Sequence, residues 1–110
     1  MILLRDFNKE KKIDRVWYDS ANVVYSECKD NNDLKTVKVV FKKGQTYVYK
    51  KVDTNDYVMF VHGGIDGSNG KALNQFIKPK YECERVADTD MIQLNEELEK
   101  LKEEKKPTNL

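Results

Sequence analysis

The segment LKTVKVVFKKGQTYVYKKV, residues 34–52, constrains the fold more than any other part of this chain. Apolar and basic residues alternate along both of its halves, which is the period of two that a half-buried strand shows. A glycine near its middle tolerates the left-handed backbone that a tight turn requires. The pattern therefore predicts an antiparallel hairpin with strands at 34–41 and 45–52.

Two turn geometries would give this hairpin different registers, and a slip of one residue moves every side chain to the other face of the sheet. A two-residue turn at Lys43-Gly44 would place Tyr47 and Tyr49 beside Lys38, as a platform on which nucleic-acid bases stack. That turn needs a positive φ at a lysine as well as at the glycine. We favour a three-residue loop at residues 42–44, because only the glycine is then left-handed. The two tyrosines would in that case face the core, opposite the lysines.

The rest of the chain predicts a small α+β domain. Strand-forming residues mark residues 13–19, 22–29 and 80–86, so the antiparallel sheet is expected to have four to five strands. Two short helices follow the hairpin. The first begins at Asp53, Thr54 or Asn55, buries Tyr57, Phe60 and Val61, and ends at Gly63-Gly64; the second is capped by Ser68 or Asn69, buries Leu73, Phe76 and Ile77, and ends at Lys78-Pro79.

A longer amphipathic helix is predicted at the C-terminal end. Asp88 or Thr89 is its expected cap, Asp90 suits the positive end of the helix dipole, and Pro107 is its expected stop. Its apolar stripe consists of Met91, Leu94, Leu98 and Leu101. Two interpretations of the stripe stay open: it covers an open face of the sheet, or it forms a homo-oligomer interface. Two heptads are too few for a stable isolated coiled coil.

Composition excludes several classes of protein. The 110 residues suffice for one domain with one modest core. No stretch approaches the roughly 18 apolar residues of a membrane span, and the apolar start MILL is too short for a signal peptide, so we expect a cytosolic protein without membrane contact. Cys28 and Cys83 are expected to be reduced core thiols, and His62 is the lone histidine, so neither a metal centre nor a cofactor is expected. No catalytic spacing is present, which favours a protein that is not an enzyme.

Charge is distributed unevenly. Residues 1–87 hold 16 basic and 12 acidic residues, whereas residues 88–110 hold 4 and 7. The abundance of lysine and asparagine is typical of an AT-rich genome, such as that of a low-GC bacterium or its phage. A mildly basic body with an acidic tail indicates local anion sites and argues against a general polyanion binder.

The order of motifs resembles the KTSC domain, a module of about sixty residues named for its place at the C-terminus of some lysyl-tRNA synthetases. The residues that carry the resemblance span 13–86: Tyr18-Asp19, Val37, Val39, Phe41, Gly44, Tyr47-Val48-Tyr49, Ser68-Asn69-Gly70, Asn74, Ile77 and Tyr81. The resemblance implies a KTSC-like α+β domain at 1–87, here as a stand-alone bacterial or phage protein, with the helix of 88–110 as an extension. It also implies RNA binding, the function usually suggested for the family.

The segment HGGIDGSNGKALN suggests an anion site, although it is not a phosphate loop of the Walker type. That pattern requires a glycine where this chain has Ile65, and a serine or threonine where it has Ala72. Backbone N–H groups around Ser68–Gly70 at a helix start, with Lys71 beside them, would still attract a phosphate. Asn74 and Lys78 follow at helical spacing and would share that face.

The function expected from these patterns is non-enzymatic binding of a phosphate-containing ligand, either RNA or a nucleotide. The candidate ligand-binding residues are Lys38, Lys50, Tyr49, Ser68, Gly70, Lys71, Asn74 and Lys78, with Lys42 as a further source of charge. An alternative is a phage anti-defence protein that, as an oligomer, sequesters a host nucleotide immune signal or inhibits a host protein. A purely structural protein-interaction module is a third hypothesis.

Overall fold

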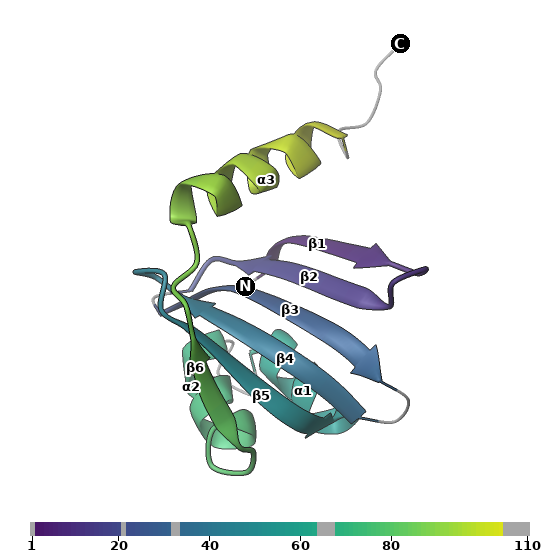
Figure 1. Cartoon of the computed structure of the whole chain (residues 1–110), viewed down its shortest axis with the longest axis vertical. Coiled ribbons are helices and arrows are strands. Elements are labelled where there is room, and N and C mark those ends of the chain that lie inside the picture. Colours follow the sequence, from purple (N-terminus) through teal and green to yellow (C-terminus); the bar gives the residue numbers. More distant parts are fainter. Residues whose placement is uncertain (1, 21, 32–33, 64–67, 105–110) are drawn as a thin grey trace.

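The computed structural model describes residues 2–20, 22–31, 34–63 and 68–104. A six-stranded antiparallel sheet runs in the order β1-β2-β3-β4-β5-β6, with α1 and α2 on one face and α3 on the other (Figure 1). The elements are β1 (Ile2–Asn8), β2 (Ile13–Tyr18), β3 (Val23–Asn31), β4 (Leu34–Phe41), β5 (Thr46–Asp53), α1 (Thr54–Val61), α2 (Asn69–Ala72), the π-helical turn η1 (Leu73–Ile77), β6 (Cys83–Val86) and α3 (Met91–Glu104). The predicted α+β class is confirmed.

The predicted count of four to five strands is wrong, because β1 adds a sixth. Residues 2–8 pair antiparallel with β2, from Ile2 opposite Tyr18 to Asn8 opposite Ile13, with an irregularity between Ile2 and Leu4. The apolar start had no turn signal or clean alternation that would have marked it as a strand. Its pairing depends on β2, so it is a tertiary feature.

The β4–β5 hairpin has the predicted three-residue loop. Val39 lies opposite Tyr47 and Val40 opposite Thr46. The same register places residue 41 opposite residue 45. The Phe41 N–H donates to the Gln45 carbonyl at 2.9 Å, and the Gly44 N–H donates to the Phe41 carbonyl at 2.9 Å. Gly44 has φ +96°, whereas Lys43 is not among the described residues with positive φ. The register therefore follows the residue that can adopt a left-handed backbone most cheaply.

This register divides the hairpin between two hydrophobic cores. Val37, Val39 and Tyr49 lie in the larger core, which is covered by α1, α2 and η1, and Phe41 and Tyr47 pack at its border. Val40 lies in the smaller core on the opposite face. The apolar and basic faces predicted for the hairpin are thus separated, and the basic face is partly covered by a helix.

That helix is α3, and its apolar stripe covers the sheet of its own chain. Leu94 and Leu98 are buried against Trp17, Tyr25 and Val40, and Met91 and Leu101 pack at the edge of the same cluster. The intrachain interpretation of the stripe is therefore the one that the structure adopts; the oligomer interface stays a prediction. The predicted cap is wrong by one or two residues, because the Asp90 carboxylate accepts from the N–H groups of Ile92 and Gln93 at 3.0 and 3.2 Å. Pro107 lies outside the described residues.

The helices on the other face follow the predicted caps. Asp53 caps α1 by accepting from the Asn55 N–H at 2.9 Å, and α1 buries Tyr57, Phe60 and Val61 as predicted. Ser68 caps the second helical segment, which is four residues of α-helix continued by η1 up to Lys78. Leu73 and Ile77 are buried there, whereas Phe76 is only partly buried.

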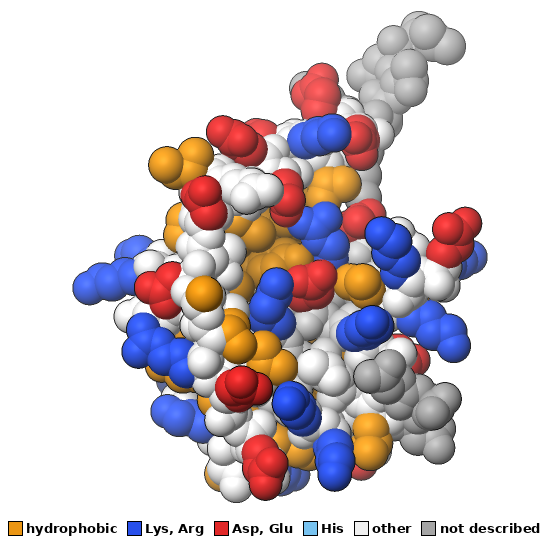
Figure 2. All heavy atoms as spheres, in the orientation of Figure 1, with side chains coloured by type: hydrophobic (Ala, Val, Ile, Leu, Met, Phe, Trp, Pro, Cys, Tyr) orange, Lys and Arg blue, Asp and Glu red, His pale blue; other side chains and the backbone are white. Residues whose placement is uncertain are grey.

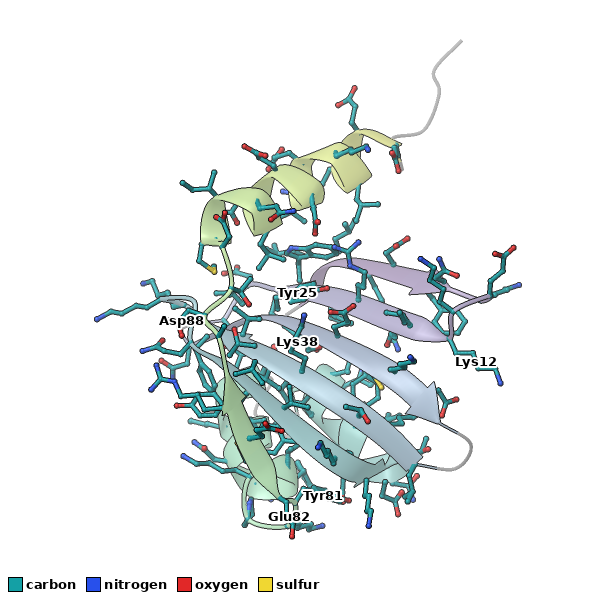
Figure 3. All side chains as sticks on the ribbon, in the orientation of Figure 1. Lys12, Tyr25, Lys38, Tyr81, Glu82 and Asp88 are labelled. Carbon is teal, nitrogen blue, oxygen red and sulfur yellow. The ribbon has the colours of Figure 1, made fainter. Side chains whose placement is uncertain are left out.

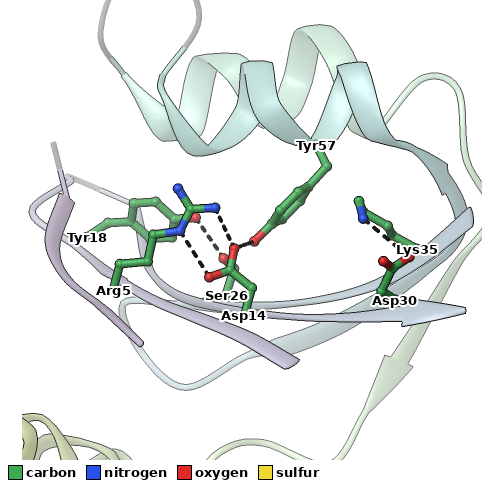
Figure 4. A network of polar contacts seen from close by, with 7 residues as sticks. All are labelled: Arg5, Asp14, Tyr18, Ser26, Asp30, Lys35 and Tyr57. Carbon is green, nitrogen blue, oxygen red and sulfur yellow. Dashed lines mark hydrogen bonds and ion pairs between the residues drawn. The ribbon is translucent and has the colours of Figure 1, made fainter. Parts of the chain in front are cut away.

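A buried polar network joins the first two strands to α1 (Figure 4). Arg5 donates to both carboxylate oxygens of Asp14, from Nε at 3.0 Å and from Nη2 at 2.8 Å. The Tyr57 hydroxyl donates to Asp14 Oδ2 at 2.6 Å. Asp14 is only 6% exposed, so its charge depends on these donors for compensation. Burial, with the Asp14 carboxylate as its neighbour, raises the pKa of Tyr57 above its usual range and keeps this donor protonated.

We expect Tyr57→Phe to lower the free energy of unfolding by about 1–3 kcal/mol, because a buried carboxylate then loses one charge-assisted hydrogen bond. Urea unfolding followed by circular dichroism measures the change. Tyr47→Phe is the matched control, since the described residues give its hydroxyl no hydrogen-bond partner. A Tyr57→Phe protein as stable as the parent would show that Arg5 alone compensates the charge.

A second polar contact ties α1 to the segment between η1 and β6. The Tyr81 hydroxyl donates to Asp56 Oδ2, and Lys80 Nζ lies 3.2 Å from Asp56 Oδ1. The hydrogen bond from Tyr81, with help from Lys80, holds the pKa of the Asp56 carboxyl below its usual value. A depressed folded-state pKa stabilises the fold above the unfolded pKa of about 4, and this stabilisation is lost as the pH falls through the folded value.

We therefore expect Asp56→Asn to destabilise the protein at neutral pH and to flatten the decline of unfolding free energy below about pH 4. Thermal unfolding between neutral pH and about pH 2 measures both effects. Asp19→Asn, which removes the charge of another acidic side chain, is the control, and Asp19 is exposed. An Asp56→Asn profile parallel to that of the parent would contradict the assignment.

Candidate functional site

A cavity of about 580 Å³ opens at the turn end of the β4–β5 hairpin, beside the end of η1. Its lining comes from five places in the chain: the residue before β3, the end of β4 with the hairpin turn, β5, the residue after η1, and β6. The lining residues are Asn22, Phe41, Lys42, Lys43, Gln45, Tyr47, Tyr49, Lys78 and Cys83. We call it the hairpin cavity. Its volume falls within the range of about 300–1,000 Å³ that small-molecule sites occupy.

Aromatic rings form one wall of the hairpin cavity. The rings of Phe41 and Tyr47 meet edge to face, with centroids 5.6 Å apart at an interplanar angle of 89°. Tyr49 is buried and lies opposite Cys83 in the β5–β6 ladder. Burial raises the pKa of Tyr49 above its usual range, and the neighbouring Cys83 thiol adds to the shift, so the phenol stays neutral. This wall offers flat apolar surface together with a hydroxyl.

The charged part of the lining is entirely positive. Lys42, Lys43 and Lys78 are exposed, and no carboxylate is among the described lining residues. Within the described part of the chain none of the three forms an ion pair. Several cations that do not line the cavity are paired: Lys50 with Glu84 at 3.6 Å, Lys80 with Asp56 at 3.2 Å, and Arg85 with Asp88 at 3.6 Å. The hairpin cavity therefore carries three positive charges that no described acid compensates.

The turn that carries two of these lysines is held from both sides. The Lys42 N–H donates to the Asn22 carbonyl at 2.8 Å. On the other side, the Thr89 N–H donates to the Gly44 carbonyl at 2.9 Å, and the hydroxyls of Thr46 and Thr89 lie 2.6 Å apart. The segment that leads into α3 is thus hydrogen-bonded to the turn that positions Lys42 and Lys43.

We expect Gly44→Ala to displace this turn, because a Cβ there would lie 2.9 Å from the Thr89 carbonyl oxygen while φ is +96°. The left-handed conformation alone costs about 1–2 kcal/mol for a residue with a Cβ. The stability loss is measurable by urea unfolding, and amide shifts of Asn22 and Thr89 report the displacement. Gly70→Ala is the control, since its Cβ would meet only the Asn22 side chain, at 3.4 Å or more, and Ser68 Oγ. Equal stability of the two variants would refute the role of Gly44.

Of the ligand-binding residues predicted from the sequence, Tyr49 and Lys78 line the hairpin cavity, as does Lys42, the further predicted source of charge. Lys38 and Lys50 do not join them. Lys38 Nζ lies 2.9 Å from Glu27 Oε2 and lines a different cavity, and Lys50 is paired with Glu84. Alternation along β4 and β5 places both lysines on the sheet face opposite the tyrosines.

The predicted anion site at Ser68–Gly70 is used for local structure. Ser68 Oγ accepts from the Lys71 N–H at 3.3 Å, and the Asn69 side chain donates to the carbonyls of Phe60 and Val61 at 2.8 and 3.0 Å. Gly70 is buried against Asn22. Lys71 and Asn74 are exposed and do not line the hairpin cavity. Ile65 lies outside the described residues.

The predicted ligand-binding residues did not include six of the lining residues: Asn22, Phe41, Lys43, Gln45, Tyr47 and Cys83. Lys43 and Gln45 flank Gly44, so the hairpin prediction contained the signal that would have located them. Asn22 and Cys83 come from distant strands, and no local pattern marks them. Cys83 is exposed, which corrects the prediction of two core thiols; Cys28 is buried, and burial raises the pKa of its thiol to about 12.

A second cavity of about 420 Å³ lies between α3 and the sheet, where Tyr25 and Lys38 point toward the helix (Figure 3). Two of its three lining cations are paired with acids, Arg15 with Glu97 and Lys38 with Glu27, and four carboxylates line it. Arg15 also lies 4.8 Å from the centre of the Trp17 ring and donates to the Tyr25 hydroxyl at 2.9 Å. Basic and acidic side chains are interspersed over this face (Figure 2). The mixture makes it a weaker anion site than the hairpin cavity.

Two other kinds of site find no support within the described residues. They contain no group of three or more His, Cys, Asp or Glu side chains placed to hold a metal ion. None of their helices has both the length and the apolar character needed to cross a membrane. His62 is exposed at the C-cap of α1.

No protein-family model matches the chain, and no curated protein shows significant similarity to it. The KTSC resemblance therefore rests on the motif residues themselves. Of these, Tyr47 and Tyr49 contribute to the hairpin cavity, Ile77 is buried, and Tyr81 donates to Asp56.

Proposed function

We propose that the chain is a non-enzymatic binding protein for a phosphate-containing ligand, a nucleotide or RNA, and that the hairpin cavity is its site. The observation that carries the proposal is the lining: three lysines that no described carboxylate pairs with, beside a wall of aromatic rings. Phosphate oxygens accept charge-assisted hydrogen bonds from lysine, and a base has a flat face that aromatic side chains stack on. The KTSC resemblance points to the same ligand class.

The proposal needs only interactions of ordinary strength. Stacking of one base on an aromatic side chain is worth about 1–3 kcal/mol, and each hydrogen bond to a charged group adds about 1.5–3 kcal/mol. The stem of each lysine is exposed, so part of this gain offsets the loss of side-chain freedom. Micromolar affinity corresponds to about 8 kcal/mol, which lies within the roughly 4–12 kcal/mol that one stacked base and two or three phosphate contacts give before this loss is subtracted.

The test is a Lys42→Gln/Lys78→Gln double variant in a binding titration against a mixture of ribonucleotides and single-stranded RNA. We expect affinity to fall at least about tenfold and the salt dependence to weaken, since two phosphate contacts are removed. Lys100→Gln is the matched control: it removes one positive charge from the exposed surface of α3, away from the cavity. Unchanged binding by the double variant would remove the hairpin cavity as the site.

Mass spectrometry of ligands released from the purified, heat-denatured protein supplies an independent result. A retained small nucleotide would support the alternative in which a phage protein sequesters a host nucleotide signal, and would count against RNA. Native mass spectrometry of the same sample tests the proposed homo-oligomer. If no ligand is retained and RNA shows no salt-dependent binding, both nucleic-acid interpretations fail.

A further inference from the structure

We infer that the ligand of the hairpin cavity is a small nucleotide with a compact group of phosphates, in preference to a polynucleotide that runs across the surface. The inference rests on the proposed function and specifies the ligand class of the same site. Three features of the cavity carry it: the gathering of three lysines without a lining acid, the arrangement of these lysines, and the residues that line the remaining wall.

Three lysines converge on the cavity, and no described acid lines it. Among the cations that do not line it, Lys50, Lys80 and Arg85 are each paired with an acid. A protein that follows a nucleic-acid backbone presents a continuous basic groove, because every phosphate along the strand carries a charge. Here the lysines that line the cavity are gathered at one place, whereas other exposed lysines, such as Lys51, Lys71 and Lys100, lie on other elements and do not line it. This distribution fits a ligand whose negative charge is concentrated in one place.

The lysines reach the cavity from two separate segments. Lys42 and Lys43 lie in the hairpin turn, and Lys78 follows η1. A terminal phosphate carries about −1.5 to −2 charges at neutral pH, so two linked phosphates match three ammonium groups closely. A single internal phosphodiester carries one charge and would leave most of this positive charge uncompensated.

The rest of the lining suits one nucleoside. Tyr47 is partly buried at the aromatic wall, where its ring meets Phe41 edge to face, and the Arg85 guanidinium lies 5.9 Å from the centre of the ring. Asn22 and Gln45 provide amide groups that can both donate and accept hydrogen bonds to a base edge or a ribose hydroxyl. The volume of about 580 Å³ is that of a small-molecule site.

The experiment is calorimetric titration of the full chain with the four ribonucleoside diphosphates, their nucleosides, pyrophosphate, and single-stranded RNA of roughly 20 nucleotides. We expect at least one diphosphate to bind about tenfold or more tighter than both its nucleoside and pyrophosphate, because only it occupies both parts of the cavity. RNA should bind more weakly than that diphosphate.

Two variants assign the parts of the ligand to the parts of the cavity. Tyr47→Leu should reduce diphosphate affinity to that of pyrophosphate and leave pyrophosphate binding unchanged, and Lys78→Gln should weaken both. Urea unfolding of Tyr47→Leu separates lost stacking from a folding defect, because a folded variant keeps a cooperative transition and still binds pyrophosphate. In the unaltered protein, the bound diphosphate should also slow alkylation of the exposed Cys83, which lines the cavity.

The outcomes separate this inference from the proposed function. RNA affinity that exceeds diphosphate affinity, with sensitivity to Lys78→Gln, would overturn the small-nucleotide inference and leave the proposed site intact. Absence of binding to every probe would overturn both. Diphosphate binding that neither Tyr47→Leu nor Lys78→Gln alters, with no protection of Cys83, would place the ligand elsewhere and also overturn both.

Discussion

The left-handed backbone of Gly44 sets the register of β4 against β5, and most of the structure depends on that register. With residues 41 and 45 opposite each other, Tyr47 and Tyr49 face α1, α2 and η1, whereas Val40 faces α3 on the other side of the sheet. A shift of one residue would exchange these faces, bury lysines and expose the tyrosines. The same glycine admits the Thr89 backbone, so the turn also anchors the segment that leads into α3.

The two faces of the sheet use their charges differently. On the α3 face, Arg15 is paired with Glu97 and Lys38 with Glu27. These partly exposed pairs add little free energy of folding, and they leave little net electric field around these side chains. On the face covered by α1, α2 and η1, a cavity at the turn end of the hairpin is lined by Lys42, Lys43 and Lys78, and no described acid lines it. A nearly neutral protein thereby keeps a local positive site, which total charge does not reveal.

Sequence patterns predicted what depends on near neighbours in the chain. The hairpin loop, the caps at Asp53 and Ser68, and the buried faces of α1 and α3 all follow from residues within one or two turns of each other. Contacts between distant segments were not predictable in this way. The Arg5–Asp14–Tyr57 network joins residues up to 52 positions apart, and neither the strand character of 2–8 nor the burial of a carboxylate has a local signature.

The sequence by itself determined that this chain forms a basic, tyrosine-bearing hairpin within an α+β domain, because alternation and a glycine turn leave one inexpensive register. Only the tertiary structure decided which lysines act together. Lys38 and Lys50 looked equivalent to Lys42 in sequence. The pleat of the sheet places both on the face opposite the tyrosines, where each is paired with a glutamate of a neighbouring strand. Lys78 lines the same cavity as Lys42 and Lys43 because η1 ends beside the hairpin. The physical reason is that charge acts over a few ångströms in space, whereas a sequence orders residues along the chain.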